Sequence, residues 1–481
     1  MRTVGWLFVA AVLGLLTWLV GAQFGHFVWS LLRSVALPLL IASIIAVGSI
    51  VFFHRVPEVA APTAVIGFLF AFVVSSGVVN WYVIPHNLAE QSEVSDSDSR
   101  PDFRHRAPYD VASAVSERNL GNTTGDATGR IKAIPAEGEH GTYTTAVVRR
   151  GVFQGYESSQ TMELPLIGST RVQDVEFCEF SENATLRFGG MVPSNNLKRA
   201  IMWRTSPSTK VDPDDAVIHC EDDVPMVYAP LTKLDGSILL PQRVPGGVAV
   251  YNGHTGELTI EDEIDTDLPL YPKSVAERQR ESLTRSGSFW EAIFRRSGYE
   301  DTSKDEQDPN GENRAEFVLS DVDAENQYYV TPLTPRGSSG SITALGTIES
   351  DGSVKSGELR TYEIHQYDDG AARQANSAVA DRITGGELRG WQASGLTVFE
   401  IVPSDNGTWT ASIGKEQEVL YRAVIHADGE IDLHEAQASQ EDEPIDSDVE
   451  ATKPIGEMTT EELQQLGDQI LEELAGRASS E

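Results

Sequence analysis

The stretch WYVIPHNLAEQSEVSDSDSR, residues 81–100, joins two parts of the chain that differ sharply in composition. It starts at the aromatic end of an apolar run, passes a proline, and becomes a segment of serine, aspartate and glutamate. Apolar runs that end in Trp and Tyr are typical of transmembrane helices, because these rings prefer the membrane–water interface. The stretch therefore separates a membrane-embedded N-terminal part from a soluble remainder.

The two parts also differ in charge. Residues 1–85 contain three arginines and one glutamate, a net charge of +2, so the remaining residues must contribute −37 to the total of −35. An acidic excess of this size keeps a domain soluble and repels nucleic acid, since phosphate binding requires clustered lysine and arginine. The composition therefore predicts no nucleic-acid partner.

Three apolar segments precede the acidic part, at residues 4–20, 35–53 and 63–84. Each is close to the ~17 to 25 residues that a membrane-crossing helix needs, and none contains a charged residue. We expect a transmembrane anchor of three helices over residues 1–85. Transporters normally carry ionisable groups at midplane depth, so these spans favour anchoring over transport.

The first segment has a second interpretation. Arg2, a long apolar run and the small residues after Val20 also fit a secretory signal that is cleaved near residue 22. Either interpretation leaves the acidic part outside when the N-terminus starts in the cytoplasm. Arg2 and Arg55 would then be cytoplasmic, in agreement with the positive-inside rule, whereas Arg33 would not. We expect a multi-pass cell-membrane protein whose bulk is extracytoplasmic, with a cytoplasm-facing scaffold as the topological alternative.

The soluble part is expected to be α+β and rich in strands. Residues 86–108 predict a polar acidic linker, because serine and acidic residues dominate and no apolar periodicity appears. Short alternating runs separated by Gly, Asn, Asp and Pro then predict two β-rich domains, at 109–272 and 315–434. Asn252-Gly253 supplies a hairpin turn in the first of them.

A short similarity connects the two predicted domains. YAPLTKLDG at 228–236 and YVTPLTPRG at 329–337 share a tyrosine, Pro-Leu-Thr and a closing glycine. Each lies at the end of a predicted strand and before another apolar run. The similarity predicts that the second domain repeats the first.

Residues 273–314 between these domains predict an amphipathic helix at 273–296 and a polar linker after it. The helix combines aromatic and aliphatic residues with the most basic stretch of the chain, namely Phe289, Trp290, Ile293 and Phe294 with Arg278, Arg280, Arg285, Arg295 and Arg296. One interpretation is an anion-binding or membrane-surface site. The other is a solvated face that pairs with neighbouring acids, and the acidic surroundings favour this second interpretation.

The last residues predict a tail. Residues 435–458 have the composition of a disordered acidic linker, and residues 459–476 predict an amphipathic helix. Its apolar face consists of Leu463, Leu466, Ile470, Leu471 and Leu474. A single short helix is marginal in water, so we expect this face to dock on another protein, on a second copy of the chain or on its own domain.

The two cysteines, Cys178 and Cys220, leave two alternatives open. In an oxidising compartment the pair would form a disulfide, whereas in a reducing one the thiols would be small buried side chains. No Cys/His cluster has the spacing of a zinc site, so neither a metal nor another cofactor is predicted.

No catalytic motif appears among the ten histidines or around the serines. The densest polar cluster, residues 219–223, ends a predicted strand, and alternation would direct its side chains to opposite faces, which indicates a structural role. The sequence therefore favours a non-catalytic membrane protein whose β-rich part serves protein interaction or a structural role in the cell envelope. A membrane-anchored extracytoplasmic hydrolase is the alternative, since a triad of distant residues leaves no local trace.

Overall fold

The computed structural model describes residues 2–95, 100–120, 125–127, 131–135, 141–164, 175–301, 317–323, 326–337, 341–367, 376–387, 395–404, 407–415 and 418–435. The chain divides into two compact units, Met1–Ala436 and Gln437–Glu481. The amphipathic helix expected at 459–476, with its five apolar residues, lies outside the described residues, as does nearly all of the acidic linker before it.

Two helices among the described residues are long and apolar enough to cross a membrane, Gln23–Phe52 and Glu58–Ala89. They belong to α1 (Arg2–Phe52) and to a continuous run of α2 (Pro57–Val78), a π-helical turn (Val79–Val83) and α3 (Ile84–Ala89). The loop expected between the first two apolar segments is helical. Residues 21–34 contain no proline, and an isolated glycine weakens a helix by only about 1 kcal/mol, so nothing there ends it.

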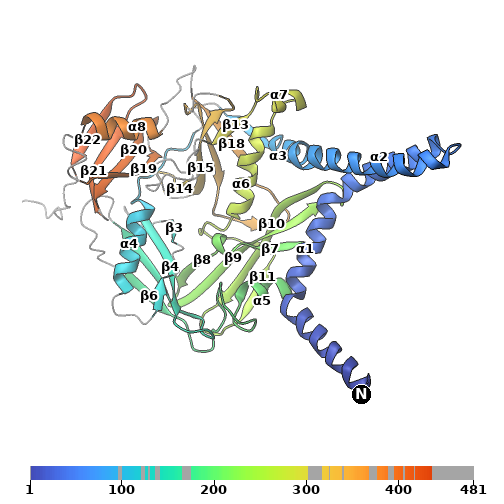
Figure 1. Ribbon diagram of the computed structural model, residues 1–481. Helices are drawn as coiled ribbons and strands as arrows, with labels where there is room; N and C mark the ends of the chain where they lie inside the picture. The colour runs from blue at the N-terminus through green and yellow to red at the C-terminus, as the bar shows by residue number, and fades with distance from the viewer. Residues whose placement is uncertain are drawn as a thin grey trace, which may run out of the picture. The chain divides into compact units, whose positions relative to one another are not determined.

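α1 and α2 form a helical hairpin whose turn lies at residues 53–56. Figure 1 shows the first part of α1 extending away from the β-rich body, its middle beside the body and its later part beside α2. Pro38 lies inside α1, where the missing amide donor favours a bend. Beyond this point, apolar side chains on both helices are exposed, including Ile44, Phe52, Ile66 and Phe70. Exposure of this kind is what lipid-facing helices show when no lipid surrounds them.

The described residues of the β-rich body form five small sheets. The first has the order β1-β18-β16-β15-β13 with β14 on β15, and its strands are β1 (Ser92–Ser95), β13 (Tyr299–Asp301), β14 (Phe317–Ser320), β15 (Gln327–Pro335), β16 (Ala344–Glu349) and β18 (Tyr362–Gln366). The second has the order β11-β10-β9-β7 with β8 on β9, and consists of β7 (Thr209–Val211), β8 (Val217–Glu221), β9 (Val224–Gly236), β10 (Pro241–Asn252) and β11 (Leu258–Glu261).

The other three sheets complete the body. The third has the order β2-β4-β5-β6 with β3 on β4, from β2 (Gly125–Ala127), β3 (Lys132–Ile134), β4 (Gly141–Arg149), β5 (Tyr156–Leu164) and β6 (Val175–Glu179). The fourth is a meander of β19 (Thr397–Pro403), β20 (Trp409–Lys415), β21 (Glu418–Ile425) and β22 (Ile431–Glu435), and β12 (Glu263–Ile264) pairs with β17 (Val354–Lys355). The helices of the body are α4 (Tyr109–Asn119), α5 (Leu197–Arg204), α6 (Lys273–Ser282), α7 (Phe289–Ile293) and α8 (Asn376–Arg382).

The first two sheets share one strand plan. In each, the strand that carries Pro-Leu-Thr is central, and its Leu, Thr and next residue pair antiparallel with a short earlier strand, β7 on β9 and β13 on β15. In each, the residue two positions before that proline pairs with the first residue of another strand, as Tyr228 does with Val217 and Val330 with Phe317. The glycine that closes each motif has positive φ, +78° at Gly236 and +79° at Gly337. This common register supports the predicted repeat.

The two repeats do not form separate domains. One core joins Val250 of β10, Val275 of α6 and Ile364 of β18, and α6 contacts strands of both sheets (Figure 1). The boundary expected at residue 272 therefore falls inside a shared core. Since the cores span the sheets, residues up to Ala436 make one compact unit.

The predicted linker at 86–108 is wrong for much of its length. Residues 92–95 form β1, which pairs in parallel with β18, and residues 102–104 bond to the chain after β14. Phe103 and Arg106 are buried, and Arg106 Nη1 lies 2.9 Å from Glu400 Oε2 in β19. The partners of this segment are more than 200 residues away in sequence, so local composition does not reveal them.

The helix expected at 273–296 is also interrupted. α6 ends at Ser282, a 3₁₀ turn follows, and α7 starts at Phe289. Gly287 between them has φ of +84°, a left-handed conformation that an α-helix does not contain. The break turns the aromatic residues of α7 away from the line of α6, so the two halves serve different surfaces.

Candidate functional site

The predicted disulfide pair lies between two sheets. Cys178 is in β6 and Cys220 in β8, and their Cα atoms are 5.9 Å apart, within the range that a disulfide requires. The two sulfur atoms are joined, and Glu176 Oε1 lies 3.6 Å from Cys220 Sγ. Among the described residues, Glu176, Cys178 and Cys220 are the only metal-ligand side chains that gather in a group of three. Oxidation of the pair in the native protein remains a prediction.

The polar cluster at 219–223 forms a hairpin turn. Asp222 and Asp223 both have positive φ between β8 and β9, as a two-residue turn of type I′ requires. Glu221 accepts a hydrogen bond of 2.5 Å from Tyr228, while Cys220 faces Glu176. These contacts hold the two strands together and leave the cluster without a common centre for catalysis.

A different feature emerges where the helical hairpin meets the body. Arg33 of α1 is buried and donates from Nη1 to Leu234 O at 2.6 Å and from Nη2 to Gly236 O at 2.8 Å and Ser237 O at 3.0 Å. These carbonyl groups belong to the last residues of β9 and to the first residue of the turn that leads to β10. The guanidinium group therefore fastens α1 to the body immediately before its last apolar segment.

The returning end of the hairpin is fastened as well. Arg285 donates from Nε to Trp81 O at 2.9 Å, and its guanidinium lies 4.2 Å from the centre of the Trp81 ring. Tyr82 donates to Gly287 O at 2.9 Å, and His86 Nδ1 lies 3.0 Å from Arg285 O. Both ends of the hairpin thus contact the same face of the body.

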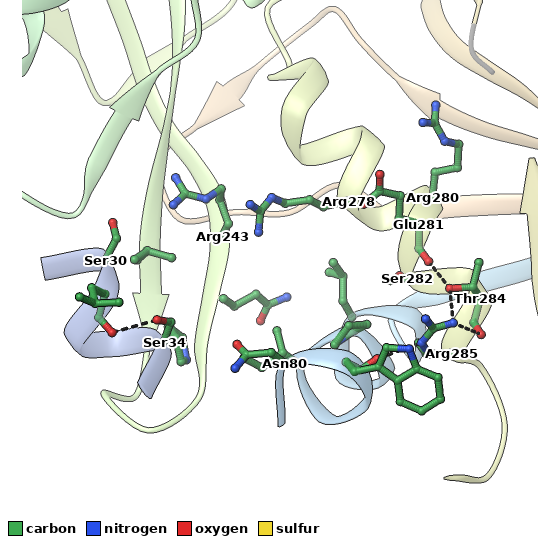
Figure 2. A pocket seen from close by; sticks show the side chains of 18 of the residues that line it. Ser30, Ser34, Asn80, Arg243, Arg278, Arg280, Glu281, Ser282, Thr284 and Arg285 are labelled. Atoms are coloured by element: carbon green, nitrogen blue, oxygen red, sulfur yellow. Dashed lines mark hydrogen bonds between the residues drawn. The ribbon is translucent and has the colours of Figure 1, made fainter. Parts of the chain in front are cut away.

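Between these two attachments lies a cavity of about 920 Å³. Its apolar wall comes from the helices, with Phe27 and Leu31 of α1 and Ile84 and Leu88 of α3. Its polar wall comes from the body, where four arginines line it: Arg243 of β10, Arg278 and Arg280 of α6, and Arg285. Figure 2 shows Arg278 extending from α6 toward Arg243.

Two of the four arginines already bind other groups of the chain. Arg285 holds Trp81, and Arg280 Nε lies 3.4 Å from Asp301 Oδ2. Arg243 and Arg278, by contrast, form no ion pair with any acidic side chain that the structure describes. Arg243 Nη1 donates to Thr232 Oγ1 at 2.9 Å, and its buried Nε has no hydrogen-bond partner among the described residues.

The electrostatics of this corner are positive. Burial lowers the pKa of Arg243 to about 10, and the neighbouring Arg278 acts in the same direction. Burial also lowers the pKa of Lys210, with further contributions from Arg243 and Arg278. The acids that line the cavity are Glu281, Glu300 and Asp301, of which Glu300 pairs with Arg295 at 2.9 Å and Asp301 with Arg280. The Arg243–Arg278 corner is therefore suited to an anion.

The sequence indicated part of this site. Arg278, Arg280 and Arg285 belong to the basic stretch for which an anion site was one interpretation, and they come together here with Arg243, which the sequence did not single out. Arg295 and Arg296 do not line the cavity. Arg243 gives no local signal, because β10 brings it to the site from outside the basic stretch. No protein family model, curated protein or solved structure matches the chain.

Proposed function

We propose that the chain is an integral membrane protein that fixes an acidic β-rich body to the outer face of the cell membrane, where the body serves protein interaction or a structural role in the envelope. The observation that carries this proposal is the attachment of both ends of the helical hairpin to one face of the body. A body linked by a loose tether would need neither attachment.

The geometry of the hairpin supports the proposed orientation in the membrane. Residues 34 and 79 lie at its two ends, so the body and both ends are on one side of the membrane and the turn is on the other. Arg55 is in that turn, and the positive-inside rule favours the cytoplasm for it. Arg33, which opposes the rule in the sequence, is buried against carbonyl groups of the body. A third span at residues 4–20, or a cleaved signal there, is compatible with this orientation.

Exposed apolar side chains around the attachments support close contact with the bilayer. Trp290 and Phe294 are 65% and 61% exposed, and the neighbouring Phe289 packs edge-on against Tyr82 with ring centres 5.1 Å apart. Ile238, 58% exposed, lies in the turn whose carbonyl groups bind Arg33. These side chains belong at the depth of the interface, where aromatic and aliphatic groups anchor a peripheral surface.

Cysteine labelling in intact cells tests the orientation. Ala427→Cys places a thiol in the exposed β21–β22 turn, and His54→Cys places one in the hairpin turn. A membrane-impermeant maleimide should label the first variant in intact cells and the second only after lysis. The native chain, whose two cysteines are buried and joined, provides the background control. The reverse pattern would make the protein a cytoplasm-facing scaffold and overturn the proposal.

A further inference from the structure

We propose that the cavity between α1, α3 and α6 is a binding site for a phosphate-bearing amphiphile. Arg243 and Arg278 bind its anionic headgroup, and the apolar side chains of α1 and α3 contact its acyl chains. This combination of groups fits an anionic phospholipid from the membrane leaflet that adjoins the β-rich body. The lipid source rests on the proposed membrane anchoring, whereas the anion site itself does not.

The first argument is the state of the two arginines. The side chain of Arg278 extends toward Arg243, and neither arginine forms an ion pair with an acidic side chain among the described residues, although the chain carries 72 Asp and Glu against 37 Lys and Arg. Like charges that approach each other cost free energy unless an anion compensates them. The buried Nε of Arg243 also has no hydrogen-bond partner in the part of the chain that the structure describes, and guanidinium groups bind phosphate through two parallel donors.

The second argument is the composition of the opposite wall. Phe27 and Leu31 face the cavity from α1, and Ile84 and Leu88 face it from α3. These residues lie within the two helices that are apolar enough to span a membrane. An amphiphile whose headgroup meets the arginines would therefore direct its chains toward the hairpin. A free inorganic anion would leave that apolar wall unused.

The third argument is size and position. Sites for organic ligands usually measure ~300 to 1,000 Å³, and this cavity has about 920 Å³. Trp81, which lines it, is an aromatic residue at the end of a span, where the headgroup region is expected. A phospholipid in the adjoining leaflet would thus find the arginines at headgroup depth.

Calorimetric titration of the full chain in a neutral detergent tests the site. The probes are dioctanoyl phosphatidylglycerol, dioctanoyl phosphatidylcholine and inorganic phosphate. The variant Arg243→Gln/Arg278→Gln removes both ligands, and Gln retains a donor for Thr232. Arg118→Gln/Arg150→Gln removes the same charge from exposed positions elsewhere and serves as the matched control. Arg278→Gln alone, at an exposed side chain, covers the case in which the double variant does not fold.

Saturable binding of phosphatidylglycerol, weakened at least tenfold in the cavity variant and unchanged in the control, supports the proposal. Tighter binding of phosphatidylglycerol than of phosphate identifies the lipid as the source, and equal binding identifies a free anion. Affinity for phosphatidylglycerol that is equal in the native and cavity variants, or matched by phosphatidylcholine, would overturn the site. Since the titration is done in detergent, a reversed labelling pattern in cells would change the leaflet and leave this result intact.

Discussion

Arg33 joins the hairpin to the body through a single side chain. Its guanidinium group donates to carbonyl oxygens at the end of β9 and in the turn after it, and the closest contact is 2.6 Å to Leu234 O. Hydrogen bonds to charged groups contribute about 1.5 to 3 kcal/mol each, and the carbonyl groups would be left unpaired without it. We expect Arg33→Met to lower the free energy of unfolding by about 2 to 3 kcal/mol, measured as a lower melting temperature in detergent.

Arg33→Lys is the matched control for this change. Lysine keeps the charge but lacks the planar fork that reaches several carbonyl groups at once, so its loss of stability should be smaller. If the melting temperature of Arg33→Met equals that of the native protein, the contact between Arg33 and the carbonyl groups does not stabilise the position of the hairpin.

His365 in β18 makes stability depend on pH. The side chain is buried, with Nε2 3.0 Å from Thr347 Oγ1 and 3.4 Å from Glu363 Oε2. Burial, with a further contribution from Arg100, lowers the pKa of His365 to about 4. The unfolded chain, with an ordinary pKa near 6.5, then binds a proton between pH 6.5 and 4 that the folded chain does not. The stabilising contribution is therefore complete above about pH 6.5 and is lost as the pH falls toward 4.

The measurement compares unfolding of the native chain and His365→Gln at pH 7.5 and pH 4.5. Over that interval the native chain should lose about 2.5 kcal/mol more than the variant. Burial raises the pKa of Asp351 to about 6, which acts in the opposite direction, but this group is common to both chains and cancels in the difference. Parallel pH profiles would show that His365 does not titrate as its surroundings indicate.

At the residue scale, the sequence predicted the features that depend only on neighbouring residues, such as the turn at Asn252. Asn252 caps its predicted turn by accepting from His254 N and Thr255 N at 2.9 Å each. It did not identify Arg33 or Arg243, whose partners are elsewhere in the chain. Arg33 is visible in the sequence between two apolar segments, but only the fold brings the carbonyl groups of Leu234, Gly236 and Ser237 to it.

At the scale of elements, α7 and the residue that follows it carry two exposed aromatic side chains. Trp290 and Phe294 stack with ring centres 6.3 Å apart and face outward beside Tyr82. If α7 lies in the interface, lipids brominated on the acyl chains should quench the fluorescence of Trp290 in reconstituted protein. We expect Trp290→Phe to remove a clear part of the quenchable signal. Trp203, which is 50% exposed on α5, supplies the control variant Trp203→Phe.

Equal quenching in the native chain and in Trp290→Phe would place α7 in water. The aromatic pair would then be a surface for another molecule, and the body would touch the membrane only at its attachments.

Helices and strands were predicted well where the pattern of apolar residues is local. They were predicted poorly where a turn or a distant partner determines where an element ends or what it pairs with. The apolar helices and the β-rich character follow from composition. The break between α6 and α7 was missed, although Ser288 and Glu291 form a capping box that marks the start of a new helix, and Gly287 before it has positive φ. The predicted repeat of β9 and β15 rests on five shared residues, and the pairing of each strand with its two earlier neighbours supports it.

At the scale of the molecule, the disulfide connects two sheets and reports the compartment. Closing a loop of this length stabilises by roughly 3 to 4 kcal/mol in the chain-entropy model. Protein isolated from membranes without reductant and then denatured should resist alkylation at Cys178 and Cys220, and both should alkylate after reduction. The reduced protein should melt at a lower temperature. Two thiols that alkylate before reduction would indicate a reducing compartment and count against an extracytoplasmic body.

The division into domains could not be predicted from the sequence. Linkers were inferred where polar residues cluster, yet residues 92–95 and 102–106 belong to the body. The cavity depends on α1, α3, β10 and α6, which are distant in sequence and adjacent only because both ends of the hairpin return to one face. Composition predicts the membrane part and the soluble part separately, whereas the contact between them requires the fold.

The parallel pairing of β1 with β18 also sets an order of events during synthesis. β1 leaves the ribosome directly after the hairpin, but its partner, Tyr362–Gln366, is translated some 270 residues later. Loop closure over such a distance is slow compared with local contacts. On the proposed membrane anchoring, the hairpin can enter the membrane before the sheet beside it is complete, and a chain that stops before β18 would keep its anchor with β1 unpaired. An exposed strand edge of that kind promotes aggregation. Between the synthesis of β1 and that of β18, the unfinished chain is therefore open to binding by chaperones and to proteolysis.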